Sequence, residues 1–388
     1  LRFDRNELHY YGYNTLFDTT LVKQDICQNF ITASANAGYK TNYNDSSHVN
    51  YDISIKYRFF QDKFQYMENE AGAVANLSYF YGKEQLGLDL DAAYYNKQLL
   101  DTVSNAVIKL EPWVCLFGDK WRIVAGLNMH TDVREQDVYY HWYPNAVLQY
   151  NIIDNILIPY AVVNGNLEVN NYRKITMENP FLAPGLTTSN TNRKLIIGGG
   201  LRGSLSSNSS YNIGAKFSQV DSMYFFVNDT TFDPLQNHFT VVYDNMEMYR
   251  FYTELSLKKS EKLNLGFRAN YYSYTVLNEE KAWHLPEYDV TISAKYNLRN
   301  TILINADLFL IGKRYAKSYD NDASYHLLKE IVDFNLGVEY RYSKILSAFV
   351  NFNNIAAMKY QRWNYYPSQR FNVIVGITWS MFGEQVGQ

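Results

Sequence analysis

Apolar and polar residues alternate with a period of two along nearly the whole chain. In the segment Leu263–Tyr272, Leu265 and Phe267 point to one side of an extended chain, while Asn264 and Arg268 point to the other. The same alternation recurs in Tyr51–Phe59, Leu86–Tyr95, Trp121–Thr131, Tyr288–Leu298, Val332–Tyr342 and Phe371–Met381. A helical spacing of apolar residues fits none of these segments, so the sequence predicts an all-β protein.

The composition of the two faces indicates a membrane-spanning sheet rather than a water-soluble one. One face is a run of apolar residues, often with an aromatic residue at its ends, and the other mixes charged residues with Asn and Gly. A strand of about 9–11 residues crosses a bilayer with aromatic girdles at both interfaces, whereas the strands of soluble sandwiches are shorter. Tyr is unusually common, at 36 of 388 residues, and charged residues make up only 19%. A soluble all-β fold is the alternative that the alternation leaves open.

The composition also excludes other classes of protein. The formal net charge of −3 gives no basic surface for nucleic acid. The longest nearly apolar run, Ile156–Val163, has eight residues, far fewer than the roughly 18–20 of a membrane helix. The cysteines, Cys27 and Cys115, lie far apart and fit no metal-binding or redox spacing, so we expect packed or idle thiols.

The lengths of the connections predict the topology. About 18 strand-like segments follow one another, and from the fourth onward short and long connections alternate. The long connections include Asn170–Asn192, Asn228–Asn237, Leu277–Pro286, Lys313–His326 and Lys359–Ser368. Short periplasmic turns and longer outer loops are typical of outer-membrane barrels. We therefore expect a transmembrane antiparallel up-and-down β-barrel of about 18 strands, or about 22 in the complete protein.

We expect residues 1–388 to form a single barrel domain with an incomplete N-terminus and a short periplasmic tail at 383–388. The final strand should pair with the first, because an unpaired edge in hydrocarbon leaves backbone groups unsatisfied.

A dense pattern of Asn and aromatic residues ends the chain. It consists of Asn351-Phe-Asn-Asn-Ile355, Lys359-Tyr360, Trp363, Tyr366-Pro367, Arg370-Phe371 and Gly376-Ile-Thr-Trp379. This pattern resembles the closing hairpin of TonB-dependent receptors, with Gln369 where that family has Gly. In addition, Asn179-Pro-Phe-Leu182 and Gly312-Lys-Arg-Tyr315 are similar to a TonB-receptor-like barrel group of the Bacteroidetes.

The resemblance implies an outer-membrane barrel and, in a true receptor, a plug domain and a TonB-contacting segment ahead of it. This sequence opens on strand-like residues, with Leu8 and Tyr10 opposed to His9 and Tyr11, and neither of those parts is recognisable in it. On sequence grounds an energised uptake function therefore loses its main support.

Charged residues of both signs fall on the polar face of the predicted strands. The lumen-facing candidates are Arg58, Asp89, Asp91, Arg122, Arg202, Arg268, Asp333, Glu339 and Arg341. They could line a polar conduit or a binding surface. The mixture of signs favours a cross-strand charge network that fills the lumen and stabilises the barrel.

Residues that suit catalysis or metal binding are sparse. His130 and His141 fall near the ends of adjacent strands and should face inward, but no third ligand has the spacing of a metal site. No Gly-x-Ser-x-Gly nucleophile elbow occurs, and Gly198-Gly-Gly200 lies inside a predicted strand without the Lys-Ser/Thr of a phosphate loop. We expect no enzymatic activity, no cofactor and no bound metal.

Two long loops carry the candidates for contact with a partner. Phe181 and Leu182 lie in the loop Asn170–Asn192, and Tyr365 and Tyr366 lie in the last long loop. Exposed aromatic anchors of this kind are favoured at interfaces. For the first loop, a self-packed lid over the barrel mouth is the alternative.

The interpretation that the sequence favours is a non-enzymatic barrel subunit of an envelope assembly, secretion or transport complex. Its expected partners are outer-membrane lipid, lipopolysaccharide and other outer-membrane or surface proteins. The alternative is a porin-like or TonB-dependent transporter for a small solute. Both interpretations place an integral protein in the outer membrane of a Gram-negative bacterium, with extracellular long loops and a periplasmic C-terminus.

Overall fold

One antiparallel sheet dominates the computed structural model, which describes residues 1–12, 26–43, 47–98, 102–231, 237–260, 262–319 and 323–380. Within these residues the sheet has 18 strands: β1 (Arg2–His9), β2 (Cys27–Lys40), β3 (Val49–Asp62), β4 (Met67–Tyr81), β5 (Glu84–Gln98), β6 (Thr102–Phe117), β7 (Trp121–Arg134), β8 (Asp137–Tyr150), β9 (Ile158–Glu168), β10 (Thr191–Ser206), β11 (Ser209–Asn228), β12 (Phe239–Ser260), β13 (Leu263–Val276), β14 (Tyr288–Leu298), β15 (Ile302–Ile311), β18 (Ile331–Arg341), β19 (Leu346–Asn353) and β22 (Asn372–Trp379). The loops add two small hairpins, β16 (Arg314–Lys317) with β17 (Tyr325–Leu328) and β20 (Gln361–Trp363) with β21 (Tyr366–Pro367), and one helix, α1 (Tyr172–Glu178).

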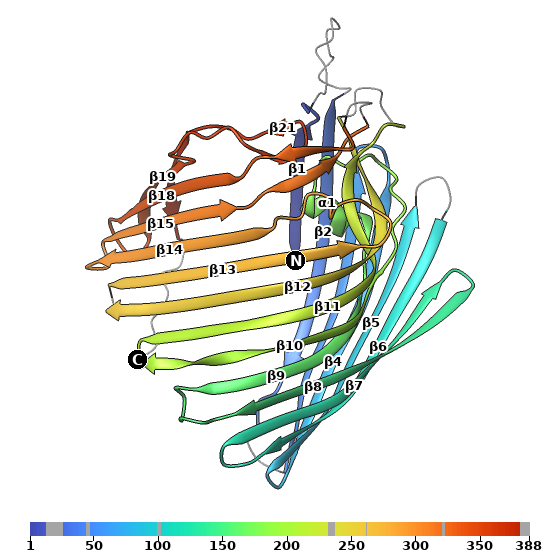
Figure 1. Cartoon of the computed structure of the whole chain (residues 1–388), viewed down its shortest axis with the longest axis vertical. Coiled ribbons are helices and arrows are strands. Elements are labelled where there is room, and N and C mark those ends of the chain that lie inside the picture. The colour runs from blue at the N-terminus through green and yellow to red at the C-terminus, as the bar shows by residue number, and fades with distance from the viewer. Residues whose placement is uncertain are drawn as a thin grey trace, which may run out of the picture.

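Sheet strands that follow one another along the chain also lie beside one another in the sheet (Figure 1). A typical ladder is β4–β5, which runs without interruption from Met67 opposite Gln98 to Tyr81 opposite Glu84. The 18 strands of this sheet among the described residues match the count of about 18 that the sequence predicts. The all-β, antiparallel architecture predicted from the alternation is therefore confirmed.

The two faces of the sheet differ in polarity. Residues that stand opposite each other in a ladder point to the same face of the sheet. The pairings therefore assign every residue of the sheet, strand by strand, to one face or the other. The face that we call the outer face exposes large apolar side chains, which include Ile55, Tyr94, Ile108, Trp142, Leu148, Ile213, Phe251, Leu255 and Ile292. The opposite, inner face carries charged and amide side chains. Leu265 lies on the outer face and Asn264 on the inner face, as the alternation predicts. A continuous apolar outer face is what contact with lipid requires.

The two ends of the sheet have connections of different length. At one end, here called the long-loop end, the connections include residues 169–190, 277–287, 312–330 and 354–371. At the other, the short-turn end, strands are joined by connections such as 82–83 and 207–208. Strands β11 and β12, with 20 and 22 residues, continue past their neighbours at the long-loop end. Their ends reach the loops that form the candidate site.

β1 and β22 are the two edges of the sheet. Among the described residues β1 pairs with β2 alone and β22 with β19 alone, so the prediction that the last strand pairs with the first is wrong for this structure. Val375 and Ile377 of β22 are 75% and 74% exposed because no second strand flanks them. The two edges are connected through loops at the long-loop end, where the Tyr11 hydroxyl donates to the Pro367 carbonyl oxygen at 3.2 Å. The expected tail at 383–388 lies outside the described residues.

Candidate functional site

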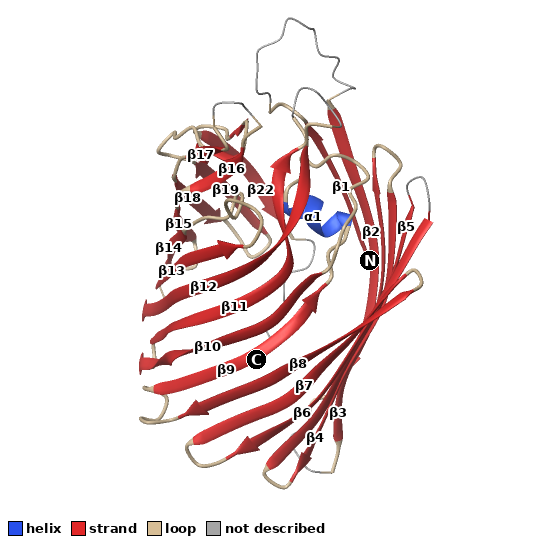
Figure 2. Cartoon of the chain, turned by 45° about the vertical axis from the view of Figure 1, so that its right-hand side comes forward, coloured by secondary structure: helices blue, strands red, loops and turns tan. Residues whose placement is uncertain are grey.

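The long-loop end is filled from the inside by a cluster of large apolar side chains. Its buried members are Phe30, Phe60, Tyr66, Tyr172, Ile175, Leu182, Tyr224, Phe226, Phe239, Trp363 and Tyr366. We call this cluster the inner cap. In Figure 2, α1, which carries Tyr172 and Ile175, lies inside the curved sheet. Burial of one such side chain stabilises a fold by about 1.5–3 kcal/mol, so the inner cap holds these loops in a defined conformation.

The helix α1 begins the loop between β9 and β10, where the sequence predicted only a loop. The side chain of Asn171 accepts a hydrogen bond from the Lys174 backbone nitrogen at 2.8 Å and so caps the helix. The Lys174 ammonium donates to Glu168 at 2.6 Å. A helix of seven residues is unstable by itself, so packing against the sheet must maintain it. No helix among the described residues is long and apolar enough to cross a membrane.

α1 connects two parts of the sheet that are far apart in strand order. At its start, the Tyr172 hydroxyl donates to Asp62 at the end of β3, and the Tyr172 backbone nitrogen donates to Glu68 of β4, both at 3.2 Å. At its end, Glu178 accepts from the Tyr224 hydroxyl on β11 at 2.6 Å. Burial raises the pKa of Tyr172 well above its ordinary value, so its phenol remains a neutral donor. The helix therefore bridges the interior from β3 and β4 to β11.

The segment after α1 packs into the inner cap. The ring of Phe181 stacks on that of Tyr366 with centroids 3.7 Å apart. Leu182 is completely buried, forms a parallel bridge with Phe239, and its carbonyl accepts from the Tyr10 hydroxyl at 2.9 Å. The burial of Leu182 agrees with the alternative of a self-packed loop. The expectation that Tyr366 is exposed is wrong, because its ring buries apolar surface against the loop that carries Phe181. The role of Leu182 and Tyr366 in contact with a partner protein stays a prediction, as does that of the half-buried Phe181 and Tyr365.

Two motifs from the sequence meet through one buried arginine. Arg314, in the Gly312–Tyr315 motif, is 3% exposed, and its guanidinium donates to the carbonyls of Gln361 and Arg362 at 2.8 Å and of Lys329 at 3.2 Å. Burial lowers its pKa to about 10, which still leaves it charged at neutral pH. Arg314, in the loop between β15 and β18, thus binds the loop between β19 and β22, which carries the Asn and aromatic pattern at the end of the sequence.

The same closing loop is fixed at two further points. Asn354 donates to the carbonyls of Met358 and Gln369 at 2.8 and 3.1 Å, and so holds the two ends of the loop together. Asn354 also adopts a left-handed backbone conformation with φ of 47°, which Asn tolerates better than most residues. Tyr360 donates to Asp333 of β18 at 2.7 Å. The resemblance to a closing hairpin therefore corresponds to a loop anchored against the inner face.

His284 is a site residue that sequence reasoning missed. Its buried ring lies 5.3 Å from that of Trp363, with Nδ1 3.0 Å from the Phe226 carbonyl oxygen. Nε2 accepts from the Asn364 backbone nitrogen at 3.3 Å, which places the proton on Nδ1. Burial lowers the pKa of His284 to about 3, so the ring is neutral. The surrounding apolar run Ala-Trp-His-Leu-Pro, at 282–286, is the signal that could have indicated a packed loop.

The ladders place all nine predicted lumen-facing residues on the inner face. Ion pairs join Arg58 to Glu70 at 2.5 Å, Arg268 to Glu254 at 3.5 Å, and Arg341 to Glu339 at 3.1 Å. Each pair joins the same or adjacent strands.

The remaining candidates have neutral partners or a charged neighbour. Two carboxylates accept from aromatic side chains: Asp89 from the Trp113 indole at 3.2 Å, and Asp333 from the Tyr360 hydroxyl. Two arginines donate to neutral side chains: Arg122 to the Cys115 sulfur at 3.2 Å, and Arg202 to Gln149. Asp91 stands opposite Lys109 in the β5–β6 ladder. The nine residues are thus distributed along the wall in small local groups rather than gathered in one binding site. Their role stays a prediction.

His130 and His141 stand directly opposite each other in the β7–β8 ladder, on the inner face. Their rings lie 5.6 and 6.2 Å from the ring of Tyr143. In the part of the chain that the structure describes, no third metal-ligating side chain joins them at coordinating distance.

The fold is similar to that of solved outer-membrane receptors. With the pyoverdine outer-membrane receptor FpvA of Pseudomonas aeruginosa the TM-score is 0.68 at 9% identity, over 92% of this chain and 62% of that one. With the ferric-catecholate import receptor Fiu of Escherichia coli it is 0.67 at 9% identity, over 91% and 64%. With the FrpB iron transporter of Neisseria meningitidis it is 0.72 at 9% identity, over 97% and 68%. No protein-family model matches the sequence, and no curated protein matches it.

These similarities establish the fold as a large antiparallel β-barrel like those of solved outer-membrane proteins, as the alternation and the connection lengths predicted. The chain spans less than two thirds of the length of the FpvA and Fiu chains. The Bacteroidetes-type resemblance stays a prediction.

Proposed function

We propose that this chain forms the barrel wall and inner cap of an outer-membrane transporter that takes up a small solute. The similarity to receptors and transporters of this fold carries the proposal. It supports the transporter interpretation better than the interpretation as an assembly subunit. In this proposal the protein lies in the outer membrane of a Gram-negative bacterium, the long-loop end faces outward, and the C-terminus faces the periplasm.

The inner cap suits a transporter because it lies across the route that a solute would take. Loops from several parts of the chain meet inside the sheet, and α1 spans from β4 to β11. Tyr and Trp side chains combine an apolar ring with a polar tip, which suits an aromatic or chelating solute better than a simple salt ion. The structural neighbours bind pyoverdine, import ferric catecholates, or transport iron or copper. We propose a small metal chelate as the solute and dependence on TonB for energy.

An uptake measurement tests this function. Cells that lack their own chelate receptors and produce this protein should accumulate radiolabelled iron or copper chelate in a saturable manner. Collapse of the proton gradient across the inner membrane should abolish accumulation. Phe181→Ala and Tyr366→Ala, which remove the stacked pair at the centre of the cap, should reduce it because the solute route is no longer shaped correctly.

The matched control is Tyr140→Ala, which removes an aromatic ring that is 68% exposed on the outer face. It should leave uptake unchanged. Uptake that continues without the proton gradient would replace TonB-dependent transport by passive diffusion, and no uptake of any chelate would contradict the proposed solute.

We also propose that this protein binds other proteins at the cell surface. A structural neighbour is known in complex with pyocin S2, which shows that a barrel of this fold can bind a protein. Binding of lipopolysaccharide and of surface proteins by this chain stays a prediction.

A further inference from the structure

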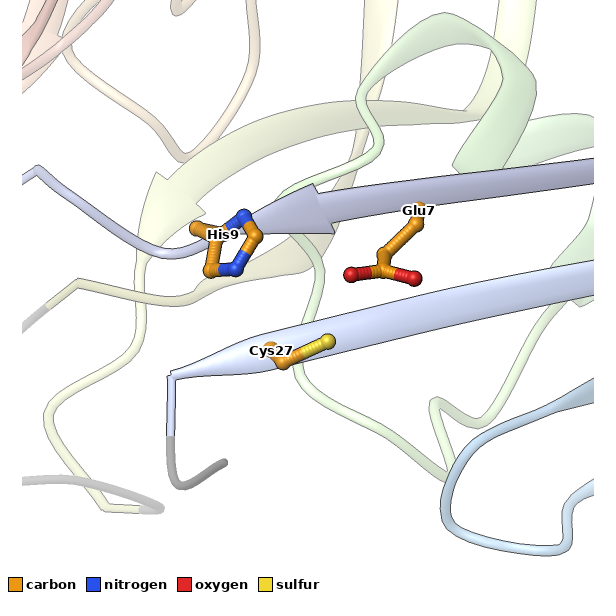
Figure 3. Close-up of side chains that lie close together, drawn as sticks. All are labelled: Glu7, His9 and Cys27. Atoms are coloured by element: carbon orange, nitrogen blue, oxygen red, sulfur yellow. The ribbon is translucent and has the colours of Figure 1, made fainter. Parts of the chain in front are cut away.

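Three side chains of different chemistry converge beside one edge of the sheet. Glu7 and His9 lie on β1, and Cys27 begins β2 directly opposite His9 in the ladder. A carboxylate oxygen, an imidazole nitrogen and the Cys27 Sγ lie within 4.8 Å of one another. Figure 3 shows the three side chains gathered between the two strands. We call them the edge triad.

The edge triad lies on the outer face, away from the inner cap. Leu8 packs against the inner cap, and Tyr10 donates to the carbonyl of Leu182 within it. Because successive residues of a strand alternate between faces, Glu7 and His9 point the other way.

The triad also lies at the end of the sheet, outside the apolar band. His9 is the last residue of β1 and Cys27 the first of β2, so both lie at the long-loop end. The Lys63 ammonium, in the turn after β3, donates to the Cys27 carbonyl at 3.0 Å, which indicates a polar rim. Among the described residues no strand covers the other side of β1, so the triad can be reached from that side.

His9 has an unmet bonding requirement at this place. Its Nε2 is buried and has no hydrogen-bond partner in the described part of the chain. A buried imidazole nitrogen without a partner is unfavourable, and a metal ion is one of the partners that imidazole prefers.

Thiolate, imidazole and carboxylate together are ligands that zinc accepts. Zinc bonds of about 2.0–2.3 Å in tetrahedral geometry place ligand atoms roughly 3.5 Å apart, so small side-chain rotations close the triad around an ion. Magnesium and calcium prefer oxygen ligands and higher coordination. We propose that Glu7, His9 and Cys27 bind one zinc ion, with water in the fourth position. Binding releases the Cys27 thiol proton to solvent and fastens the end of the edge strand β1 to β2.

Cobalt titration of the purified full chain tests the site. Chelator-treated protein should take up one equivalent of Co²⁺ with a thiolate-to-cobalt charge-transfer absorption, and one equivalent of Zn²⁺ should remove that absorption. Cys27→Ser should abolish the absorption, and His9→Ala should weaken zinc binding at least about tenfold. Cys115→Ser and His48→Ala are the matched controls and should bind as the unaltered protein does. A charge-transfer band that persists in Cys27→Ser, or that disappears in Cys115→Ser, would overturn the proposal.

Hydrogen exchange gives a second measurement that does not depend on the thiol. Zinc should slow amide exchange in β1 of the unaltered protein and leave it unchanged in Glu7→Gln, whose folding is checked by heat modifiability. Equal slowing in both proteins would show that the zinc acts elsewhere. Neither measurement involves transport, so the zinc site and the proposed function stand or fall separately.

Discussion

At the scale of single residues, the face on which a side chain lies decides what it tolerates. Ile292 lies in the middle of β14 on the outer face and is 43% exposed, while its neighbour Ser293 lies on the inner face opposite Asp307. Lipid cannot solvate a guanidinium, whereas a water-accessible inner face can.

Ile292→Arg should therefore destabilise the folded protein by about 2–4 kcal/mol, and Ser293→Arg should have little effect. Urea titration in lipid vesicles, followed by heat modifiability, measures both free energies of unfolding. Equal tolerance of the two substitutions would show that the faces are assigned wrongly.

His284 gives the inner cap a dependence on pH. Its folded pKa of about 3 lies below the ordinary value of about 6.5, so between these values the unfolded loop binds the proton that the folded loop refuses. The contribution of neutral His284 to the free energy of unfolding is complete above pH 6.5. It declines as the pH falls toward 3, by up to about 1.4 kcal/mol per pH unit.

In His284→Gln the decline in the free energy of unfolding should become smaller. Tryptophan fluorescence, to which Trp283 and Trp363 contribute, measures the free energy of unfolding during urea titration at pH 7 and at pH 5. The control is His48→Gln, in an exposed turn, which should retain the decline. The same slope in His284→Gln as in the unaltered protein would assign the effect to another group.

At the scale of elements, the strands could be predicted and the inner cap could not. The alternation of apolar and polar residues in β13 or β18 indicates directly which side chains lie on the outer face. This is because the environment of each residue is set by its own strand and by the two neighbouring strands. The packing of Leu182 depends instead on Tyr10, 172 positions away, and that of Tyr366 on Asn237, 129 positions away. No local pattern encodes such contacts, so the aromatic residues of the long loops could be interpreted equally well as exposed anchors.

The charged side chains illustrate the same limit. Alternation predicted that Arg58 and Arg268 share a face, and the ladders agree. Their carboxylate partners, Glu70 and Glu254, depend on the register between strands. A shift of one residue would separate both pairs, and the sequence of one strand does not fix that register.

We expect the hydrogen bonds of Arg314 to be the contacts that contribute most to holding the loop 354–371 against β16. Arg314→Met leaves the carbonyls of Gln361, Arg362 and Lys329 without the guanidinium that donates to them, and we expect a loss of about 2–4 kcal/mol and faster proteolysis within that loop. Arg362→Met, the removal of an exposed guanidinium in the same loop, is the matched control and should change neither. If both variants resist protease like the unaltered protein, the loop is held by its aromatic packing instead.

At the scale of the whole molecule, the inner cap should limit passage through the interior. The purified protein should conduct weakly in planar bilayers, because α1 and the cap lie inside the sheet. Replacement of residues 172–186 by a short Gly-Ser linker should increase the single-channel conductance several-fold.

Replacement of Asp154 and Asn155 by Gly, in a turn at the opposite end, is the control and should leave the conductance unchanged. A large, steady conductance of the unaltered protein would mean that water passes around the cap.

The unpaired edges matter at this scale as well. β1 and β22 present backbone N–H and C=O groups that no strand among the described residues pairs. Within hydrocarbon these groups need partners, so the two edges are where any further strand would be accommodated.

The order of the strands also has a consequence for the route by which the chain reaches its fold. Every ladder of the large sheet joins strands that are consecutive around it and separated along the sequence by a single connection, so hairpins can form one after another with little loss of loop entropy. The loop contacts that connect the two edges of the sheet are of the opposite kind, because the Tyr11–Pro367 hydrogen bond spans 356 positions. Such contacts can form only after both ends of the sheet exist. Folding should therefore end with a slow docking of the long loops into an interior that the strands have already enclosed.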